Sequence, residues 1–202
     1  VTVSASGEEK GSAEFPGMKF TVTTDTNSKC TVTATADKAG KAVIKGLPAG
    51  NYTITGDMTA IPAAYHQQKK SAEVKISESS PAVTAALTYK QMTLTLKAVD
   101  SRTQKAISGA EIQIAKKDGS GKKTVKTNEK GEAILTGYLE CGMTYKIKQN
   151  RVSGYFDASS SQLKSSEYTV KSEGEDPTIT FSSQPTVLKV GVIDDVSETS
   201  PY

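Results

Sequence analysis

Residues 40–52 read GKAVIKGLPAGNY, and residues 131–145 read GEAILTGYLECGMTY. In both stretches a glycine opens a short apolar run, and a second glycine follows before a turn that leads to a tyrosine. An alternating strand continues from each tyrosine, YTIT at residues 52–55 and YKIK at residues 145–148. Strand side chains point to opposite faces in turn, so one face of each strand is apolar. The pattern predicts one β-rich unit that occurs twice.

The similarity between the two halves extends beyond these stretches. Residues 15–22 (FPGMKFTV) and 107–114 (ISGAEIQI) both run from an apolar residue through a glycine turn into an alternating strand. A short closing strand is expected at residues 83–89 and again at residues 179–183. The opening strands match as well, since each places a row of apolar residues on one face: Val1, Val3 and Ala5 in the first half, and Met92, Leu94, Leu96 and Ala98 in the second.

This repetition predicts two modules, at residues 1–90 and 91–187. A chain of 202 residues is long enough for each to close its own core. The join near Lys90 is only a few residues long, which favours a stiff rod over freely tumbling modules. Residues 188–194 (LKVGVID) repeat the phase of residues 94–100 (LTLKAVD). Residues 188–202 are therefore either a tail that adds an edge strand or the start of a third module.

The composition favours strands and a thin core. Apolar residues make up 36% of the chain and aromatic residues 6%, and tryptophan is absent, so the core must be built largely from Val, Ile, Leu, Ala and Tyr. Thr, Val and Ser are abundant, and β-branched side chains pack well on a pleated surface. The fold class that we expect is all-β, with two tandem immunoglobulin-like or prealbumin-like β-sandwich modules.

The charge pattern argues against several classes of protein. The 25 basic and 22 acidic residues are scattered along the chain, and arginine is rare, whereas a nucleic-acid binder gathers Lys and Arg on one face. No apolar run approaches the ~20 residues that span a bilayer. Val1 does not open a signal peptide, so we expect the signal of an exported precursor to lie outside this sequence.

Three motifs in fixed order carry a resemblance to a known family. They are SGAEI at residues 108–112, TNEKG at residues 127–131 and GLPAGNY at residues 46–52. Together they resemble the B-repeat domain (Cna-B type, prealbumin-like) of Gram-positive collagen adhesins and pilins. Carboxypeptidase regulatory-like and starch-binding-like prealbumin folds share parts of the pattern. The resemblance implies a sandwich of about seven strands that serves as a stalk module.

Many members of that family close an isopeptide bond from a buried Lys to an Asn or Asp, assisted by a buried Glu. Burial removes the charge of the lysine and makes it a nucleophile, and the carboxyl group shuttles the proton. All three groups must be in phase with the core. Lys97 is not in phase, because it falls on the face opposite Leu94 and Leu96. We find other residues at the three positions: Ala5, Gly56 and Tyr89 in the first module, and Ala98, Gln149 and Ser183 in the second.

We therefore expect no isopeptide bond. Lys97 with Gln149 is the only alternative pair, and it would need a bulge to turn Lys97 inward, while Gln149 has no proton to transfer. Without a covalent tie, a pulled module is expected to lengthen by unzipping of its terminal strands.

Other reactive residue types lack a supporting motif. His66 is expected on a surface loop, since no nucleophile motif such as GxSxG accompanies it. Residues 173–176 (EGED) and Asp194–Asp195 lack the ordered ligand spacing of a calcium loop, so solvated acidic turns are expected. Cys30 and Cys141 form no CxxC and are expected to be unpaired thiols. The sequence thus predicts no catalytic, cofactor-binding or metal-ligating residue.

Tyrosines recur at equivalent places in the two halves. This favours rings that pack in the sandwich with their hydroxyls at its rim, as expected for Tyr52, Tyr65, Tyr145 and Tyr155. A sugar-stacking platform would instead use the remaining exposed aromatic residues, Tyr138, Phe156 and Tyr168.

The function that we predict is that of a non-enzymatic, secreted structural or adhesive stalk of a bacterial cell-surface protein, adhesin-like or pilin-like, located at the cell surface or cell wall. Its expected partners are neighbouring modules of the same protein, with a host matrix protein or a glycan as alternative ligands and no nucleic acid or membrane. Two alternatives stay open. One is a carbohydrate-binding or accessory module of a secreted polysaccharide-degrading enzyme, and the other is an adhesin that binds host matrix directly.

Overall fold

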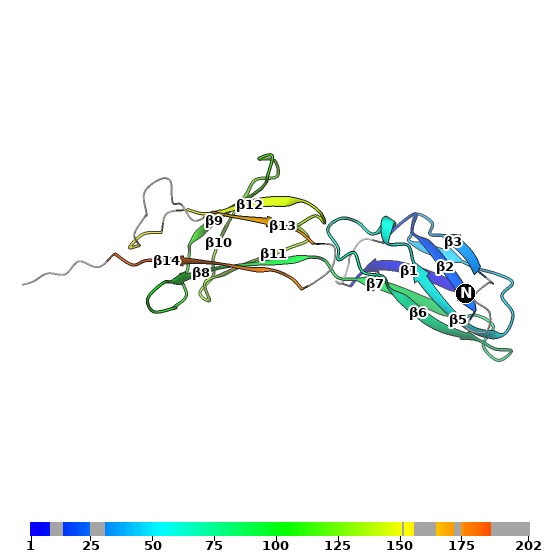
Figure 1. Ribbon diagram of the computed structural model, residues 1–202. Helices are drawn as coiled ribbons and strands as arrows, with labels where there is room; N and C mark the ends of the chain where they lie inside the picture. Colours follow the sequence, from blue (N-terminus) through cyan, green and yellow to red (C-terminus); the bar gives the residue numbers. More distant parts are fainter. Residues whose placement is uncertain (9–13, 25–30, 151, 156–164, 172–174, 187–202) are drawn as a thin grey trace, which may run out of the picture.

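The protein consists of two β-sandwiches placed end to end (Figure 1). The computed structural model describes residues 1–8, 14–24, 31–150, 152–155, 165–171 and 175–186. Fourteen strands and one 3-10 helix lie in this part of the chain, seven strands in each sandwich, so the all-β expectation is confirmed. No described helix has the length and apolar character needed to cross a membrane.

The first module pairs a three-stranded sheet, in the order β4-β1-β7, with a four-stranded sheet, in the order β3-β2-β5-β6. A single 3-10 turn, η1 (Met58–Ala60), follows β5 and is capped by the side chain of Asp57. The strands are β1 (Thr2–Gly7), β2 (Lys19–Thr24), β3 (Thr31–Thr35), β4 (Lys41–Val43), β5 (Gly50–Gly56), β6 (Ser71–Ile76) and β7 (Thr84–Tyr89).

The second module repeats this topology with sheets in the order β11-β8-β14 and β10-β9-β12-β13. The motifs that repeat in the sequence therefore occupy the same strands and turns of both modules. The strands are β8 (Thr93–Asp100), β9 (Glu111–Lys116), β10 (Lys123–Lys126), β11 (Glu132–Thr136), β12 (Thr144–Gln149), β13 (Ser165–Thr169) and β14 (Thr178–Ser183).

The first and last strands of each module lie side by side and run parallel. In the first module β1 pairs with β7 from Thr2–Thr84 to Gly7–Tyr89, and in the second β8 pairs with β14. The chain consequently enters a module at one end of this pair and leaves at the other. A pull on both ends loads all the inter-strand hydrogen bonds together, in shear. The expectation that terminal strands unzip one bond at a time is wrong for this arrangement.

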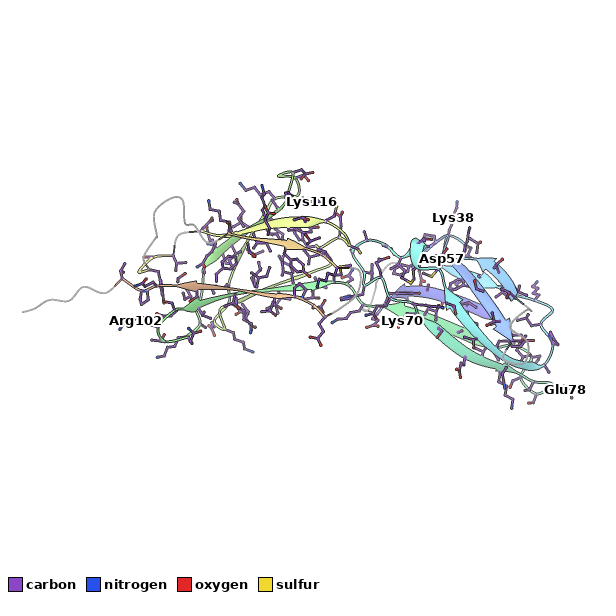
Figure 2. All side chains as sticks on the ribbon, in the orientation of Figure 1. Lys38, Asp57, Lys70, Glu78, Arg102 and Lys116 are labelled. Carbon is purple, nitrogen blue, oxygen red and sulfur yellow. The ribbon has the colours of Figure 1, made fainter. Side chains whose placement is uncertain are left out.

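The side chains follow the alternation that the sequence predicts. Every second residue of β8 is buried, and Leu94 and Leu96 are fully buried. Burial of each such leucine contributes roughly 1.5–3 kcal/mol. Charged side chains, among them the labelled Lys38, Lys70 and Arg102, project outward (Figure 2).

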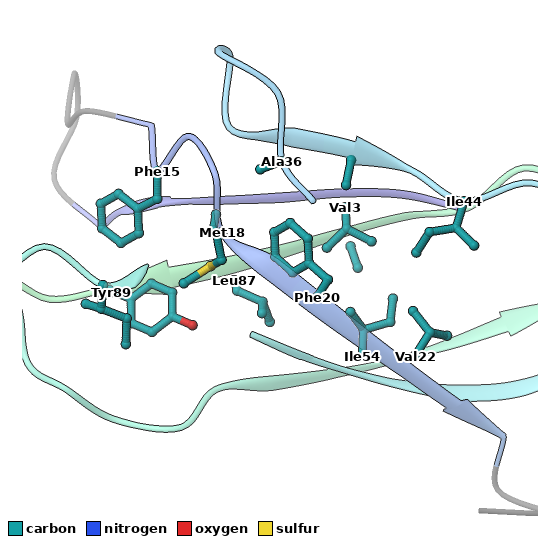
Figure 3. Close-up of a cluster of buried hydrophobic side chains, with 14 of the residues drawn as sticks. Val3, Phe15, Met18, Phe20, Val22, Ala36, Ile44, Ile54, Leu87 and Tyr89 are labelled. Carbon is teal, nitrogen blue, oxygen red and sulfur yellow. The ribbon is translucent and has the colours of Figure 1, made fainter. Parts of the chain in front are cut away.

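Each module has its own core. In the first, Phe15 packs edge-on against Tyr65, with ring centroids 4.9 Å apart, and also lies 5.5 Å from the ring of Tyr89. Phe20, Ile54 and Leu87 fill the space between the sheets (Figure 3). The buried residues of the second module form separate clusters that share no member with the first.

Candidate functional site

The first candidate site is the position where the family resemblance places a cross-link. In the second module Ala98 on β8 is fully buried and pairs with Phe181 on β14. Gln149, at the end of β12, is 4% exposed, and its Nε2 donates a hydrogen bond to Ser183 Oγ at 3.1 Å. The structure thus brings Gln149 and Ser183 together, beside the strand that carries Ala98. Their assignment to the three cross-link positions stays a prediction.

The equivalent position in the first module is filled by an aromatic ring. Ala5 and Tyr89 are each 1% exposed, and Gly56 is buried. A Cβ atom built on Gly56 would lie 2.7 Å from the hydroxyl of Tyr89, so the ring occupies the space that a side chain at residue 56 would need. Here the absence of a side chain on β5 makes room for the tyrosine of β7.

The buried hydroxyl of Tyr89 has no hydrogen-bond partner among the residues that the structure describes. Burial raises the pKa of Tyr89 to about 12. An unpartnered buried hydroxyl costs about 1–3 kcal/mol, because its hydrogen bonds to water are lost without replacement. Tyr89 therefore stabilises the first module through its ring and not through its polar atom.

Lys97 lies on the outer face of β8, as the phase of the strand predicts. Its ammonium group is 2.9 Å from Glu132 Oε1 on the neighbouring β11. The hydrogen bond from Lys97 lowers the pKa of Glu132. Lys97 is paired with Glu132 on the face of β8 opposite the core, so it is not placed to act as a nucleophile toward the core.

In each module a tyrosine hydroxyl forms a hydrogen bond with the backbone of the turn that precedes the fifth strand. Tyr52 donates to Pro48 O at 2.8 Å, and the hydroxyl of Tyr145 accepts from the backbone N–H of Glu140 at 3.1 Å. Both rings are buried. The predicted packing role is confirmed for these two residues. Tyr155 is only half-buried and lies with a small cluster at the far end of the second module.

Tyr138 and Tyr168, the two sugar-stacking candidates that the structure describes, form no open platform. Tyr138 packs against Tyr145, with ring centroids 5.7 Å apart, and its hydroxyl donates to Gly121 O. Tyr168 is partly buried against the core of the second module. Phe156 lies outside the described residues.

His66 does not lie on an exposed surface loop, and that expectation is wrong. It is 9% exposed, because the second module covers it, and its Nε2 atom is 2.9 Å from Asp176 Oδ1. Asp176 is likewise not a solvated residue of an acidic turn, since it accepts hydrogen bonds from both modules. The sequence carried no signal for this pair, because 110 residues separate its members.

The remaining candidates are the acidic residues considered for calcium binding and the two cysteines. Within the described ranges no group of three or more His, Cys, Asp and Glu side chains could hold a metal ion. Cys141 is a free thiol. Cys30, residues 173–174 and Asp194–Asp195 lie outside the described residues.

A family model for a prealbumin-like fold domain, named SpaA, matches residues 5–91 and again residues 92–185. The chain belongs to this family. The resemblance drawn from the sequence motifs is thereby confirmed, and so is the tandem of two prealbumin-like domains. A search of curated proteins finds no match.

Several solved structures are similar to the SpaA-family tandem. The TIE protein of Bacillus anthracis is 24% identical, with a TM-score of 0.47, and the match covers 91% of this chain and 33% of that protein. This chain thus spans about a third of its length. A double mutant of the shaft pilin SpaA of Lactobacillus rhamnosus GG is 15% identical, with a TM-score of 0.38 and coverage of 94% and 98%. The minor pilin GBS52 of Streptococcus agalactiae is 16% identical, with a TM-score of 0.40 and coverage of 95% and 98%.

The contrast between Tyr89 and Tyr52 predicts opposite effects of removing a hydroxyl. Tyr89→Phe should leave stability at neutral pH unchanged or raise it by about 1 kcal/mol, since an unpartnered buried group is removed. Tyr52→Phe should lower stability by about 1 kcal/mol, because the bond to Pro48 is lost. Chemical denaturation of the full chain, followed by amide signals of the first module, measures both.

The same pair tests the raised pKa of Tyr89. The unfolded phenol loses its proton near pH 10 and the folded one at about 12, so the stabilisation is present below pH 10 and is lost between these values. Tyr89→Phe should flatten this alkaline loss of stability, whereas Tyr52→Phe should retain it. Equal alkaline loss in Tyr89→Phe and the unmodified protein would show that Tyr89 is not the group responsible.

Proposed function

We propose that the chain is a non-enzymatic pair of stalk modules from a secreted, adhesin-like or pilin-like protein of a Gram-positive cell surface or cell wall. The observation that carries the proposal is the end-to-end arrangement of two prealbumin-like sandwiches (Figure 1). Only a short segment separates Tyr89, at the end of β7, from Thr93, at the start of β8. Such a join holds one module ahead of the other and extends the chain.

The strand order supports a role in carrying load. Because β1 and β7 run parallel, as do β8 and β14, a pull along the chain acts along paired strands in both modules. The load passes from β7 into β8 through the short join. A spacer that holds a binding face away from a cell needs this property.

The proposed module boundaries are residues 1–90 and 91–187. The way the chain leaves the second module supports the view that residues 188–202 open a third. Met92 N donates to Ala64 O at 2.9 Å where the chain leaves the first module, and Thr186 N donates to Gly154 O at 3.0 Å where it leaves the second. Residues 187–202 themselves lie outside the described part of the chain.

We also propose that the chain has no catalytic, cofactor-binding or metal-ligating residues and no isopeptide bond. Support comes from Ala98, Gln149 and Ser183, which occupy the cross-link position with an alanine, an amide and a hydroxyl. None of these is an amine nucleophile or a carboxyl acid. In the first module the same place holds a glycine and a tyrosine ring.

Binding assays on the intact 202-residue chain test the stalk function. The chain is applied to an array of glycans and to immobilised matrix proteins, collagen among them, at a concentration high enough to register weak binders. A spacer gives no saturable signal on either surface. Saturable binding to a glycan would favour the accessory-module alternative, and saturable binding to a matrix protein would favour the direct adhesin.

Intact-mass measurement tests the absence of a cross-link. Formation of an isopeptide bond expels ammonia or water, which lowers the mass by roughly 17 or 18 Da per bond. We expect the unmodified mass, and we expect the denatured chain to be cut throughout by protease. A mass that is short by one such unit would show that a lysine reaches the core, and that the phase assigned to Lys97 is wrong.

A designed variant supplies the positive control for that measurement. Ala98→Lys, Gln149→Glu and Ser183→Asn together place an amine, an acid and a carboxamide at the three positions. Attack of the lysine Nζ on the asparagine Cγ forms the amide and releases ammonia, so the mass should fall by roughly 17 Da. The matched variant with Gln149→Ala lacks the proton shuttle and should keep its full mass.

A further inference from the structure

The join between the modules is held by backbone hydrogen bonds from both sides. The loop before β6 presents Ala63, Ala64 and His66 to the second module and to the connecting segment. Cys141 N donates to Ala63 O at 2.8 Å, Met92 N donates to Ala64 O at 2.9 Å, and His66 N donates to Lys90 O at 3.0 Å. These bonds keep the modules in contact.

One carboxylate, that of Asp176, accepts several hydrogen bonds at this join. Asp176, just before β14 in the second module, accepts through Oδ1 from the backbone N–H of Thr93 at 2.8 Å, and the same oxygen is 2.9 Å from His66 Nε2. Its Oδ2 atom accepts from the ammonium group of Lys90. Asp176 therefore bonds at once to a loop of the first module, to the connecting segment and to the start of β8.

The electrostatics keep this carboxylate charged at neutral pH. Burial acts to raise the pKa of Asp176, but the bonds from Lys90, Thr93 and His66 outweigh it and hold the pKa below its usual value. Only 19% of the Asp176 side chain is exposed. Hydrogen bonds to a charged, part-buried acceptor stabilise more than hydrogen bonds between neutral groups.

A pocket of about 270 Å³, partly open to solvent, lies at the join. Apolar residues such as Met92 and Leu139 line it together with the polar residues His66, Glu175 and Asp176. Close packing fixes orientation in a protein core because it leaves few voids. At this join the polar contacts of Asp176 add to the constraint from the backbone hydrogen bonds.

Only the second module has an acid two residues before its last strand. Thr2 N donates to Val83 O, and Thr95 N donates to Pro177 O, so Pro177 corresponds to Val83 and Asp176 corresponds to Ala82. The first module thus has an alanine in place of the acid at this position. The exits from the modules match through the bridges Tyr65–Gln91 and Tyr155–Pro185. By that register Gln184 stands where Lys90 stands in the first module.

We propose that Asp176 is a latch that fixes the orientation of the second module relative to the first by binding His66, Lys90 and Thr93. Because Ala82 and Gln184 replace the acid and the lysine at the other module ends, the latch is specific to this join. It makes the tandem a rod of fixed geometry.

Residual dipolar couplings measured on the full chain at neutral pH test the latch. In a rigid tandem the couplings of the two modules fit one alignment tensor, whereas released modules need two tensors of different magnitude. We expect the couplings of both modules to fit one tensor in the unmodified protein and to need two tensors in Asp176→Ala. Glu175→Ala is the matched control, because it removes an exposed carboxylate from the adjacent position and should keep one tensor.

A second pair of variants separates the hydrogen bond from a general loss of stability. His66→Ala removes the donor to Asp176, so the couplings of the two modules should no longer fit one alignment tensor. His66→Gln places an amide near the position of Nε2, and its couplings should again fit one tensor. Amide shifts within each core show whether the modules stay folded. If Asp176→Ala fails to fold, the His66 pair decides.

Several results would overturn the proposal. They are two tensors in the unmodified protein, one tensor in the folded Asp176→Ala and His66→Ala variants, equal loss in Glu175→Ala, or failure of His66→Gln to restore the couplings. None of these results bears on the stalk function itself, which the binding assays test separately.

Discussion

The parallel pairing of the first and last strands is the constraint on which this structure depends. It completes the three-stranded sheet of each sandwich, in which β1 and β8 are the central strands and β7 and β14 are edge strands. It also sends the chain out of a module at the end opposite to its entry, which lets the next module begin where the last one ends. The elongated tandem (Figure 1) and the loading of both modules in shear follow from this one feature.

The two modules fill the proposed cross-link position in different ways. Relatives in the wider family are expected to hold a lysine, an acid and an amide between the sheets at this place, and all three must be shielded from water. In the second module Gln149 and Ser183 satisfy part of each other's polarity by a hydrogen bond. In the first, Gly56 leaves room for the ring of Tyr89. The second module thus fills this position with a hydrogen-bonded pair and the first with a packed ring, whose hydroxyl lacks a partner among the described residues.

Much of this could be predicted from the sequence, since it depends on local periodicity. Alternation placed Ala98 in the core and Lys97 on the outer face, and the repeated glycine–tyrosine motif located β5 and β12 correctly. The relative direction of β1 and β7 could not be predicted, because a period of two is the same for parallel and antiparallel pairs. His66 and Asp176 were interpreted as solvated for a similar reason. Each lies in a polar stretch, and only the docking of two modules brings them together.

The central claim is that each module is a load-bearing sandwich held by parallel terminal strands and by no covalent tie. Single-molecule pulling on the intact chain tests it most directly, with the force applied at the two termini. The account predicts two separate unfolding events, each releasing roughly 25–30 nm of chain, as expected when a module of this size becomes fully extended. A module that withstands the force without releasing its length would contradict the account, because only a covalent tie between its first and last strands could hold the chain that lies between them.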